Sequence, residues 1–376
     1  MIYLDYAATT PIRPEVIAVY NEVAEQYYGN ASSLHDVGTK AERAITLCRE
    51  KFAQFLNGEK DGVYFTSGGS EANILAVRSL ILGNNSKGRH LITTEVEHAS
   101  LYHLFKQLGT EGYEVTFLGV NAKGQIDIDE LRQAIRPDTI LASIQYANSE
   151  TGVIQPVAEI GALLKQHQVI FHTDAVQAFG KIPLDVEFCK IDSVSIASHK
   201  IYGPKGNGAC YIRPDVQWNS VHTGATHQNG FRMGTVDVPG VVAFTTAAEL
   251  LINEATTEQA RLQRLRTYFI EKITTTTQGE IQVEGHPTEQ LPHIIGLSCN
   301  KVQGQYIMLE CNRYGIAIST GSACQVGQQE PSRTMLATGK TVDIANSFIR
   351  LSFGLQTKEE EVDKVVTVIE KVMMEI

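Results

Sequence analysis

The sequence lacks the cysteine spacing of a zinc ribbon or a disulfide scaffold. Its six cysteines are scattered over 376 residues, and no two of them form a CxxC pair. No apolar run approaches the roughly 20 residues that a bilayer-spanning helix needs. The first 15 residues, MIYLDYAATTPIRPE, hold no basic segment followed by an apolar one, so we expect no signal peptide. These absences argue against membrane-spanning and disulfide-stabilised proteins, and they predict a cytoplasmic protein.

The sequence is also poor in features that bind nucleic acids or nucleotides. It has 32 Lys and Arg against 42 Asp and Glu, a formal net charge of −10, and no run of basic residues. We therefore expect no direct binding to nucleic acid. Neither GxGxxG nor GxxxxGKS/T occurs, which argues against dinucleotide binding and against a Walker-type phosphate loop.

Short β-rich apolar segments alternate with amphipathic segments over the first two-thirds of the chain. The apolar segments are residues 62–67, 90–94, 139–147, 169–175, 193–198 and 208–213. Strands that are apolar on both faces and alternate with helices indicate an α/β fold, with a mostly parallel sheet covered by helices on both sides. Ligands of such sheets bind beyond the carboxyl ends of the strands, which is where the polar residues of this sequence fall.

The pattern changes near residue 240. Two helical stretches, 238–255 and 257–276, precede shorter apolar segments (HIIGLSC, IAIST and SFIRLSF), a helix near 303–314 and an amphipathic helix from 357 onward. A chain of this length also exceeds what a single core usually holds. We therefore predict a large domain over 15–256 and a smaller α+β domain formed by 1–14 and 257–376.

Two strand-end segments could bind a ligand. TSGGSEAN (66–73) is a strand, a turn of small residues and a helix start with Ser70 as the expected N-cap, and free N–H groups there attract phosphate. HTDAVQAFGK (172–181) ends an apolar strand with Asp174 and places Gln177 three residues on. Each motif alone also fits an ordinary turn or a cap. His172 and Asp174 could suggest a metal pair, but no third ligand has a suitable spacing.

Two further residues could carry covalent chemistry. Lys200, in SHKIYGPKGNG (198–208), follows a strand, where a desolvated amine could form a Schiff base; a solvated loop lysine is the alternative. Cys324 lies among small and polar residues in STGSACQVGQQEPS (319–332), so its thiol is expected to be accessible, whereas the other cysteines are expected in the core. Lys200, Asp174, a helix N-terminus and the basic anchor Arg350 together match the needs of pyridoxal phosphate.

Seven segments, in this order, resemble the NifS/IscS-type cysteine desulfurases, which are fold type I pyridoxal-phosphate enzymes of the class V aminotransferase group. They are YLDYAATTP, YGNASSLH, FTSGGSEAN, EHAS, HTDAVQ, SHKIYGPKG and STGSAC, and the similarity extends to LSFG and TKEEEVD near 351–363. The resemblance implies a homodimer with pyridoxal 5′-phosphate as cofactor and L-cysteine as substrate. It also implies that L-alanine is released and that a persulfide on Cys324 passes to a protein sulfur acceptor. That acceptor would serve iron–sulfur cluster assembly, tRNA thiolation or cofactor synthesis.

The resemblance also implies a role for each site residue. Lys200 would form the internal aldimine and later move the Cα proton, and Cys324 would attack the substrate sulfur. His98 would stack on the ring and assist proton transfer. Asp174 would pair with the pyridine nitrogen, and Gln177 with the ring hydroxyl. The cofactor phosphate would be bound by Gly69, Ser70, Ser198 and His199. Thr235 would contact the phosphate of the partner subunit's cofactor. The substrate would be bound by Asn148, Ser149 and Arg350.

Two segments depart from the family pattern. Asn148-Ser149-Glu150 stands where the family often has NNE, so a short hydroxyl replaces the second amide, which commonly contacts cofactor or substrate. GATHQ (224–228) replaces a GGGQE-type segment that usually lies near the dimer contact and the active-site entrance. The stretch after Cys324 has the length found in members with a long catalytic loop, and we expect such a loop to carry the persulfide outward.

Two alternatives remain open. The first is a related enzyme of the same fold, either a selenocysteine lyase or a class V aminotransferase. Cys324 favours the desulfurase, because an aminotransferase has no use for this thiol. The second is a non-catalytic scaffold of a sulfur pathway, and the presence of Lys200, Asp174 and His98 speaks against it.

Overall fold

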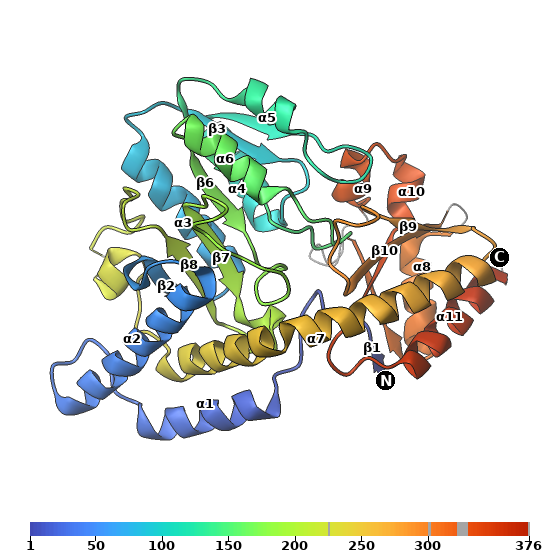
Figure 1. Cartoon of the computed structure of the whole chain (residues 1–376), viewed down its shortest axis with the longest axis horizontal. Coiled ribbons are helices and arrows are strands. Elements are labelled where there is room, and N and C mark those ends of the chain that lie inside the picture. The colour runs from blue at the N-terminus through green and yellow to red at the C-terminus, as the bar shows by residue number, and fades with distance from the viewer. Residues whose placement is uncertain (225, 300–301, 322–329, 375–376) are drawn as a thin grey trace.

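The computed structural model describes residues 1–224, 226–299, 302–321 and 330–374. The larger sheet contains β2 (Val63–Thr66), β3 (His90–Thr94), β4 (Glu114–Leu118), β5 (Thr139–Ser143), β6 (Ile170–Asp174), β7 (Ser193–Ala197) and β8 (Gly208–Ile212). Their order is β2-β8-β7-β6-β5-β3-β4 (Figure 1). β8 is antiparallel to both of its neighbours, and every other neighbouring pair is parallel. The prediction of a mostly parallel sheet is confirmed.

Helices cover both faces of this sheet, which is why its strands could be recognised as continuous apolar runs. Every residue of β2, β3, β5, β6, β7 and β8 is buried. β4, by contrast, is an edge strand whose residues are mostly half-buried, so its segment lacks a continuous apolar run and was not predicted. The helices of this part are α1 (Pro14–Gln26), α2 (Asp36–Leu56), α3 (Gly69–Asn84), α4 (Ala99–Thr110), α5 (Ile128–Ala134) and α6 (Val157–Gln166), with short 3₁₀ helices η1 (Lys60–Gly62), η2 (Ser198–Lys200) and η3 (His227–Gly230).

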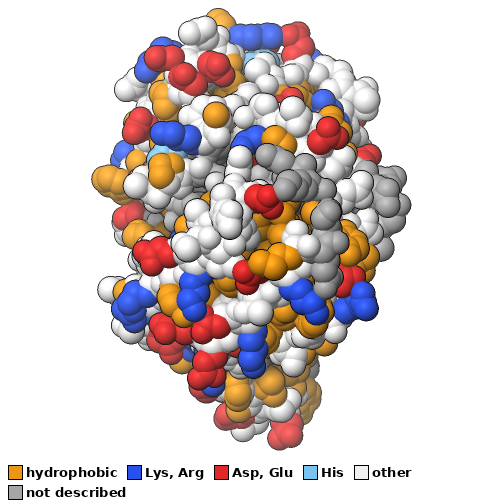
Figure 2. Space-filling view, turned by 90° about the vertical axis from the view of Figure 1, so that its right-hand side faces the viewer, with side chains coloured by type: hydrophobic (Ala, Val, Ile, Leu, Met, Phe, Trp, Pro, Cys, Tyr) orange, Lys and Arg blue, Asp and Glu red, His pale blue; other side chains and the backbone are white. Residues whose placement is uncertain are grey.

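A smaller antiparallel sheet follows in the second part of the chain. Its strands are β9 (Ile281–Glu284), β10 (Ile294–Cys299), β12 (Ser319–Thr320) and β13 (Ile349–Ser352), in the order β12-β13-β10-β9. The N-terminal strand β1 (Ile2–Tyr3) pairs in parallel with β11 (Ile316–Ala317). The accompanying helices are α8 (Gly304–Arg313), α9 (Arg333–Ala337), α10 (Val342–Asn346) and α11 (Glu359–Met374). Figure 2 shows this end of the molecule, where acidic and basic side chains are interspersed.

A single long helix, α7 (Val238–Thr276), joins the two parts (Figure 1). The prediction of two helices that meet at residue 256 is wrong, because no glycine or proline interrupts the segment there and the chain can continue as a helix. The N-terminal half of α7 packs in the core of the large sheet, through residues such as Val241 and Phe244. The C-terminal half packs in the second core, through residues such as Leu265 and Phe269. The two cores agree with a division of the chain near this helix, but the domain boundaries stay a prediction.

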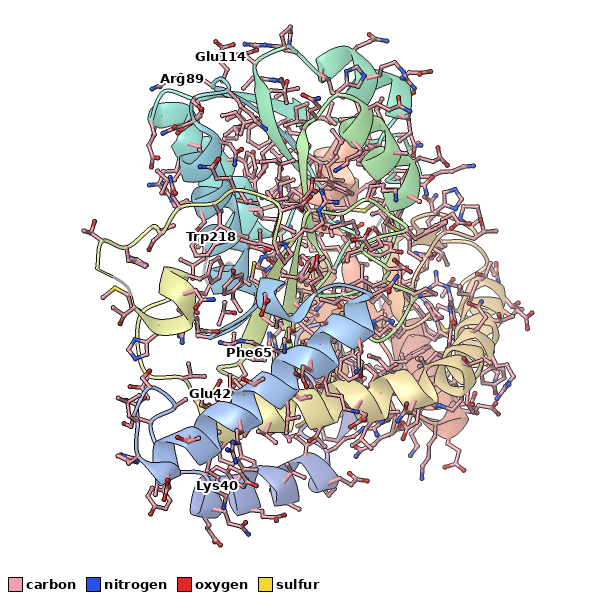
Figure 3. All side chains as sticks on the ribbon, turned by 60° about the vertical axis from the view of Figure 1, so that its left-hand side comes forward. Lys40, Glu42, Phe65, Arg89, Glu114 and Trp218 are labelled. Carbon is pink, nitrogen blue, oxygen red and sulfur yellow. The ribbon has the colours of Figure 1, made fainter. Side chains whose placement is uncertain are left out.

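Aromatic side chains join α2, the large sheet and α7. The ring centroid of Phe52 lies 4.7 Å from that of Phe244 on α7 and 5.6 Å from that of Phe65 on β2. Figure 3 shows α2 crossing α7 beside the labelled Phe65. Such edge-to-face and tilted pairs add about 0.5–1.5 kcal/mol each beyond the area they bury. Within the described residues, no helix has both the length and the hydropathy of a membrane span.

Candidate active site

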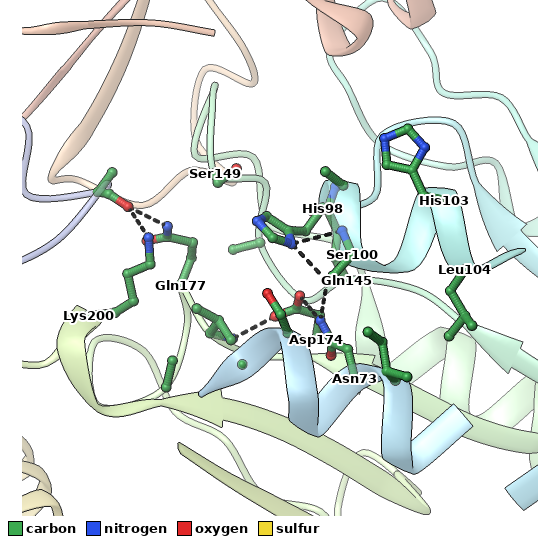
Figure 4. Close-up of a pocket in the computed structure, with 18 of the residues that line it drawn as sticks. Asn73, His98, Ser100, His103, Leu104, Gln145, Ser149, Asp174, Gln177 and Lys200 are labelled. Carbon is green, nitrogen blue, oxygen red and sulfur yellow. Dashed lines mark hydrogen bonds between the residues drawn. The ribbon is translucent and has the colours of Figure 1, made fainter. Parts of the chain in front are cut away.

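A cavity of about 710 Å³ lies beyond the carboxyl ends of the parallel strands. The segments that follow β2, β3, β5, β6 and β7 all reach it, and β13 of the smaller sheet closes one side. This is the place where the sequence predicted the ligand site. The predicted site residues that line the cavity are Gly69, Ser70, His98, Ser149, Asp174, Gln177, His199, Lys200 and Arg350. Figure 4 labels five of them, namely His98, Ser149, Asp174, Gln177 and Lys200.

Lys200 follows β7 and ends the short helix η2, so its side chain enters the cavity from the end of a buried strand. Its Nζ donates hydrogen bonds to the carbonyl oxygens of Ala7, at 2.6 Å, and Ala8, at 2.8 Å. The N-terminal segment of the chain therefore forms one wall of the site. A half-buried lysine held by carbonyl groups at a cavity wall is positioned for a ligand, which argues against a solvated loop lysine.

Asp174 is the last residue of β6 and is 6% exposed. Its Oδ1 accepts a hydrogen bond from the N–H of Val176 at 2.9 Å, and its Oδ2 accepts one from Asn73 Nδ2 at 2.8 Å. Gln177 donates from Nε2 to the carbonyl oxygen of Ala7 at 3.0 Å. Its Oε1 is buried and has no partner among the described residues, so one acceptor at the cavity wall is left for a ligand.

His98 is the N-cap of α4, and its ring contacts Ser100 twice. Nδ1 accepts the backbone N–H of Ser100 at 3.2 Å and lies 2.8 Å from its Oγ. Since Nδ1 accepts a backbone N–H, the neutral ring carries its proton on Nε2. Ser100 Oγ also accepts from Asn73 Nδ2 at 3.1 Å, so His98 is joined to Asp174 through Ser100 and Asn73 (Figure 4).

The N-terminus of α3 faces the same cavity. Gly68 is its N-cap, with φ +151°, and no side chain of the described residues caps the helix there. The prediction that Ser70 is the N-cap is wrong, because the helix begins at Gly69 and Ser70 lies within its first turn. An uncapped first turn leaves backbone N–H groups for an anion. Ser198 Oγ is buried without a partner among the described residues.

His199 lines the cavity near this helix terminus. Its Nδ1 lies 3.3 Å from Thr9 Oγ1. Burial, followed by repulsion from Lys200 and Lys205, lowers the pKa of His199 to about 4. The ring is therefore neutral near pH 7 and offers a hydrogen bond, not a charge, to an anionic group.

Arg350 brings the smaller sheet into the site from β13. It is 5% exposed, and it donates from Nη1 to the carbonyl oxygen of Ser149 at 2.9 Å and from Nη2 to Asp5 Oδ1 at 2.7 Å. Its Nε is buried with no partner in the described part of the chain. A guanidinium held in this way can bind a carboxylate in the cavity.

Four predicted residues are not among the lining residues. Asn148 is buried, and its Oδ1 accepts the backbone N–H groups of Glu150 and Thr151, both at 2.9 Å, so it shapes the turn that carries Ser149. Ser198 is fully buried between the lining residues Ala197 and His199 in the sequence. Thr235 is exposed and away from the cavity of its own chain. Cys324 lies outside the described residues.

Two other predicted features have local explanations. His172 lies between neighbouring strands, with Nδ1 2.8 Å from Ser143 Oγ and Nε2 3.1 Å from Ser195 Oγ, so it is a core residue. Burial lowers its pKa to about 3. Within the described residues, no three His, Cys, Asp or Glu side chains form a metal-binding group. In the GATHQ segment, the Gln228 side chain bonds the N–H and carbonyl of Phe65, both at 2.6 Å, and so supports β2.

The structure also adds residues that the sequence reasoning missed. Asn73, Ser100 and Gln145 line the cavity, and the buried Glu97 supports it. Asn73 could have been found, because it lies one helical turn after Gly69 and thus on the same side of α3. Glu97 Oε1 accepts the N–H of Gln145 at 2.9 Å and the hydroxyl of Thr94 at 2.8 Å. Nothing in its sequence position distinguishes this buried carboxyl from an exposed one.

These observations fit pyridoxal phosphate. Gln177 Oε1, Ser198 Oγ and the N–H groups of the α3 terminus have no side-chain partner within the described part of the chain, so they are available to a ligand. Lys200 supplies the amine, and Asp174 supplies a carboxylate that is fixed by two hydrogen bonds. The donor set therefore matches an aldehyde, a pyridine nitrogen and a phosphate in one molecule.

Comparison with known proteins agrees with this chemistry. A match to the aminotransferase class-V family model spans residues 2–365. The chain belongs to this family. It is 49% identical over 365 residues to a putative cysteine desulfurase NifS of Bacillus subtilis, covering 97% of this chain and 92% of that protein. It is 39% identical over 375 residues to the cysteine desulfurase IscS of Methanosarcina thermophila. This match covers 100% of this chain and 92% of that protein.

A solved structure shows the same fold. A NifS-like protein superposes with a TM-score of 0.93 at 29% identity, covering 100% of both chains. The predictions of the NifS/IscS family and of the fold type I architecture are confirmed.

Proposed function

We propose that this chain is a pyridoxal-phosphate-dependent cysteine desulfurase, which takes sulfur from L-cysteine and releases L-alanine. The observation that carries the proposal is the convergence of Lys200, Asp174 and Arg350 on one cavity in a chain of the NifS/IscS family. Lys200 and Asp174 fit the cofactor, and Arg350 fits the carboxylate of an amino acid. Bound pyridoxal phosphate supplies an electron sink for bond breaking at the substrate.

The position of each residue in the cavity suggests its role toward the cofactor or the substrate. Asp174 would hold the pyridine nitrogen protonated, Gln177 would face the ring hydroxyl, and the α3 terminus would take the phosphate with Gly69, Ser70, Ser198 and His199. Lys200 would take the Cα proton and later return one. His98, which carries its proton on Nε2, would stack on the ring and donate that proton during the reaction.

The sulfur step uses Cys324. Its thiolate would attack the sulfur of L-cysteine, so that an S–S bond forms while the C–S bond breaks. The electron pair of the broken bond stays with carbon, and protonation then gives L-alanine. The persulfide on Cys324 would pass to a protein acceptor for iron–sulfur cluster assembly, tRNA thiolation or cofactor synthesis.

A homodimer belongs to the same proposal. Thr235 is exposed and lies outside the cavity of its own chain. This position suits a contact with the cofactor phosphate of a partner subunit. The cytoplasmic location expected from the sequence stays a prediction.

A comparison of three substrates, each supplied separately, tests the proposal against the related reactions. Purified protein with pyridoxal phosphate and a thiol reductant is given L-cysteine, L-selenocysteine or L-alanine with a keto acid. We expect sulfide and alanine from L-cysteine at the highest kcat/KM, and none from a Lys200→Ala variant. A matched Lys123→Ala variant, in an exposed loop, should retain full activity. Preference for selenocysteine, or transamination without sulfide, would favour the alternative enzymes.

A further inference from the structure

The carboxyl group of Glu150 joins the turn after β5 to the start of α9. Its Oε2 accepts a hydrogen bond from Ser332 Oγ at 2.5 Å, and its Oε1 accepts one from Thr334 Oγ1 at 2.9 Å. Ser332 is the N-cap of α9, and Thr334 lies in the first turn of that helix. One side chain of the large part therefore binds two hydroxyl groups that come from the second part of the chain.

The turn that carries Glu150 is also attached to the main cavity. Asn148 Oδ1 accepts the N–H of Glu150 at 2.9 Å, and Asn148 Nδ2 lies 3.4 Å from Thr334 Oγ1. The residue between them, Ser149, lines the cavity and accepts a hydrogen bond from Arg350 through its carbonyl oxygen. The contacts of Glu150 with α9 are thus made directly beside the cavity wall.

Gly321 contacts the same carboxyl group from the other side. It follows β12 and lines the main cavity. A Cβ at this position would collide with Glu150 Oε2, and it would lie 3.0 Å from Phe348 Cδ1 and 3.1 Å from Ser332 Cβ. Glycine therefore lets the backbone after β12 approach both Glu150 and Ser332 closely.

Gly321 and Ser332 lie on either side of Cys324 in the sequence, three residues before it and eight residues after it. Both meet Glu150, so the described residues that flank Cys324 converge on one carboxyl group. The chain consequently leaves the smaller sheet and returns to α9 at the same point of the cavity wall.

Arg333 gives α9 a second attachment, to the turn that carries His98. Its Nε donates to the carbonyl oxygen of Glu95 at 3.0 Å, and its Nη2 donates to that of Glu97. The guanidinium carbon lies 3.8 Å from the ring centroid of Tyr102 on α4. Because Arg333 contacts α9 independently of Glu150, we expect the helix to remain folded when Glu150 is replaced.

The environment of Glu150 makes its hydroxyl partners necessary. Burial, the largest cause, raises the pKa of Glu150, and the hydrogen bonds from Ser332 and Thr334 act in the opposite direction. The charges of Arg350 and Arg333 also oppose the effect of burial. A buried oxygen that loses its donor is unfavourable, so the carboxyl group and the two hydroxyl groups stabilise one another.

We propose that Glu150 is a positioning residue for the sulfur step, because it fixes the described residues on both sides of Cys324 at the wall of the main cavity. The inference rests on the proposed function, which assigns Cys324 as the nucleophile. Reactions between two groups depend steeply on how precisely each is held. Glu150 should therefore matter for the step that uses the thiol and matter little for the steps that do not.

Two reactions of the full-length protein loaded with pyridoxal phosphate separate these steps. The first is sulfide formation from L-cysteine, which the proposed function assigns to Cys324. The second is exchange of the Cα hydrogen of L-alanine with solvent deuterium, which uses Lys200 and Arg350 but no thiol. A Cys324→Ala variant is the reference, because it should lose the first reaction and keep the second.

Three variants change the contacts of Glu150. Glu150→Ala removes both hydrogen bonds, and Glu150→Gln keeps the side-chain length and one acceptor oxygen. Gly321→Ala places a Cβ against the carboxyl group. Glu159→Ala, at an exposed position on α6, is the matched control.

We expect kcat for sulfide formation to fall about 10–100-fold in Glu150→Ala and in Gly321→Ala. Glu150→Gln should lose less, and Glu159→Ala should match the wild type. Deuterium exchange into L-alanine should stay within about twofold of the wild type in all four variants. Unchanged sulfide formation in Glu150→Ala and Gly321→Ala would overturn the inference. Equal losses in both reactions would also overturn it, since they would mean that the cavity as a whole is distorted.

Amide hydrogen exchange measured by mass spectrometry tests the anchoring without any activity. We expect peptides that contain residues 319–321 and 332–337 to exchange about tenfold faster in Glu150→Ala than in the wild type. Unchanged exchange on either side of Cys324 would overturn the inference. If the wild type binds the cofactor but forms no sulfide, the proposed function fails, while the exchange rates still decide whether Glu150 anchors both sides. If Glu150→Ala does not fold, Thr334→Val removes one hydroxyl group at nearly the same volume and provides the same comparison.

Discussion

Asn73 Nδ2 donates a hydrogen bond to Asp174 Oδ2 at 2.8 Å, and it also lies 3.1 Å from Ser100 Oγ. One amide on α3 thereby connects the carboxylate at the end of β6 with the residue that orients His98 on α4. The relationship fixes Asp174 and His98 relative to each other before any ligand binds. Such preorganisation lowers the cost of binding the cofactor ring.

We predict that Asn73→Ala weakens pyridoxal phosphate binding about tenfold. The substitution leaves a buried carboxylate oxygen short of a donor, which costs about 1–3 kcal/mol. Spectroscopic titration of the protein with the cofactor measures the dissociation constant. Ser79→Ala, on the same helix, is the matched control, because Ser79 Oγ is buried without a partner in the part of the chain that the structure describes, and its loss should change little. Equal affinities for Asn73→Ala and the control would contradict the role assigned to this amide.

Arg350→Gln should raise KM for L-cysteine and lower kcat/KM by about 10–100-fold. A hydrogen bond between charged groups is worth about 1.5–3 kcal/mol, and the substitution removes it from the substrate carboxylate. Cofactor binding should stay close to that of the wild type, because Arg350 contacts Ser149 and Asp5 rather than the α3 terminus. Steady-state kinetics and a cofactor titration measure the two effects. A loss of cofactor affinity without a change in KM would show that Arg350 acts elsewhere.

Ser149→Asn tests the departure from the family pattern. Ser149 lines the cavity, and its backbone carbonyl already holds Arg350. A longer amide at this position should reach further into the cavity and raise kcat/KM for L-cysteine several-fold. Ser149→Ala is the control, because it removes the hydroxyl without lengthening the side chain, and it should have little effect on kcat/KM. A lower kcat/KM for Ser149→Asn would instead show that the site is adapted to serine.

Glu97 should make the stability of the fold depend on pH. Burial, the largest cause, raises its pKa from 4.5 to about 8, so the folded state keeps a proton that the unfolded chain loses. The free energy of unfolding therefore falls as pH rises between 4.5 and 8, by roughly 1.4 kcal/mol per pH unit from this group. Below pH 4.5 both states hold the proton, and the group has no effect.

Glu97→Gln should remove this contribution. The amide resembles the protonated carboxyl, so we expect the variant to be more stable than the wild type at pH 8 and to lose less stability between pH 5 and 8. Urea unfolding at several pH values measures both quantities. Glu130→Gln, at an exposed position on α5, is the control, and its free energy of unfolding should depend on pH as that of the wild type does. If the free energy of unfolding of Glu97→Gln falls with pH as steeply as that of the wild type, Glu97 is ionised in the folded state.

Local sequence patterns predicted most strands, because strands covered on both faces are continuous apolar runs. The edge strand β4 was missed, since partial exposure gives it no such run. The helix α7 was divided in two, because its buried residues belong to two separate cores and its apolar pattern changes midway. Asp174 and Lys200 were recognisable at strand ends. Contacts such as those of Ala7 with Lys200, or Asp5 with Arg350, join residues about 190 and 345 positions apart, and no local pattern records them.

The most direct test of the proposed function is the amount of sulfide and alanine formed from L-cysteine by the wild type, Cys324→Ala and Cys48→Ala. Cys48 is buried in α2, so Cys48→Ala controls for the loss of a thiol outside the site. With pyridoxal phosphate and a thiol reductant present, we predict equal sulfide and alanine from the wild type and from Cys48→Ala, and neither product from Cys324→Ala. Full turnover by Cys324→Ala, or a cofactor-loaded wild type that forms neither product, would contradict the proposal.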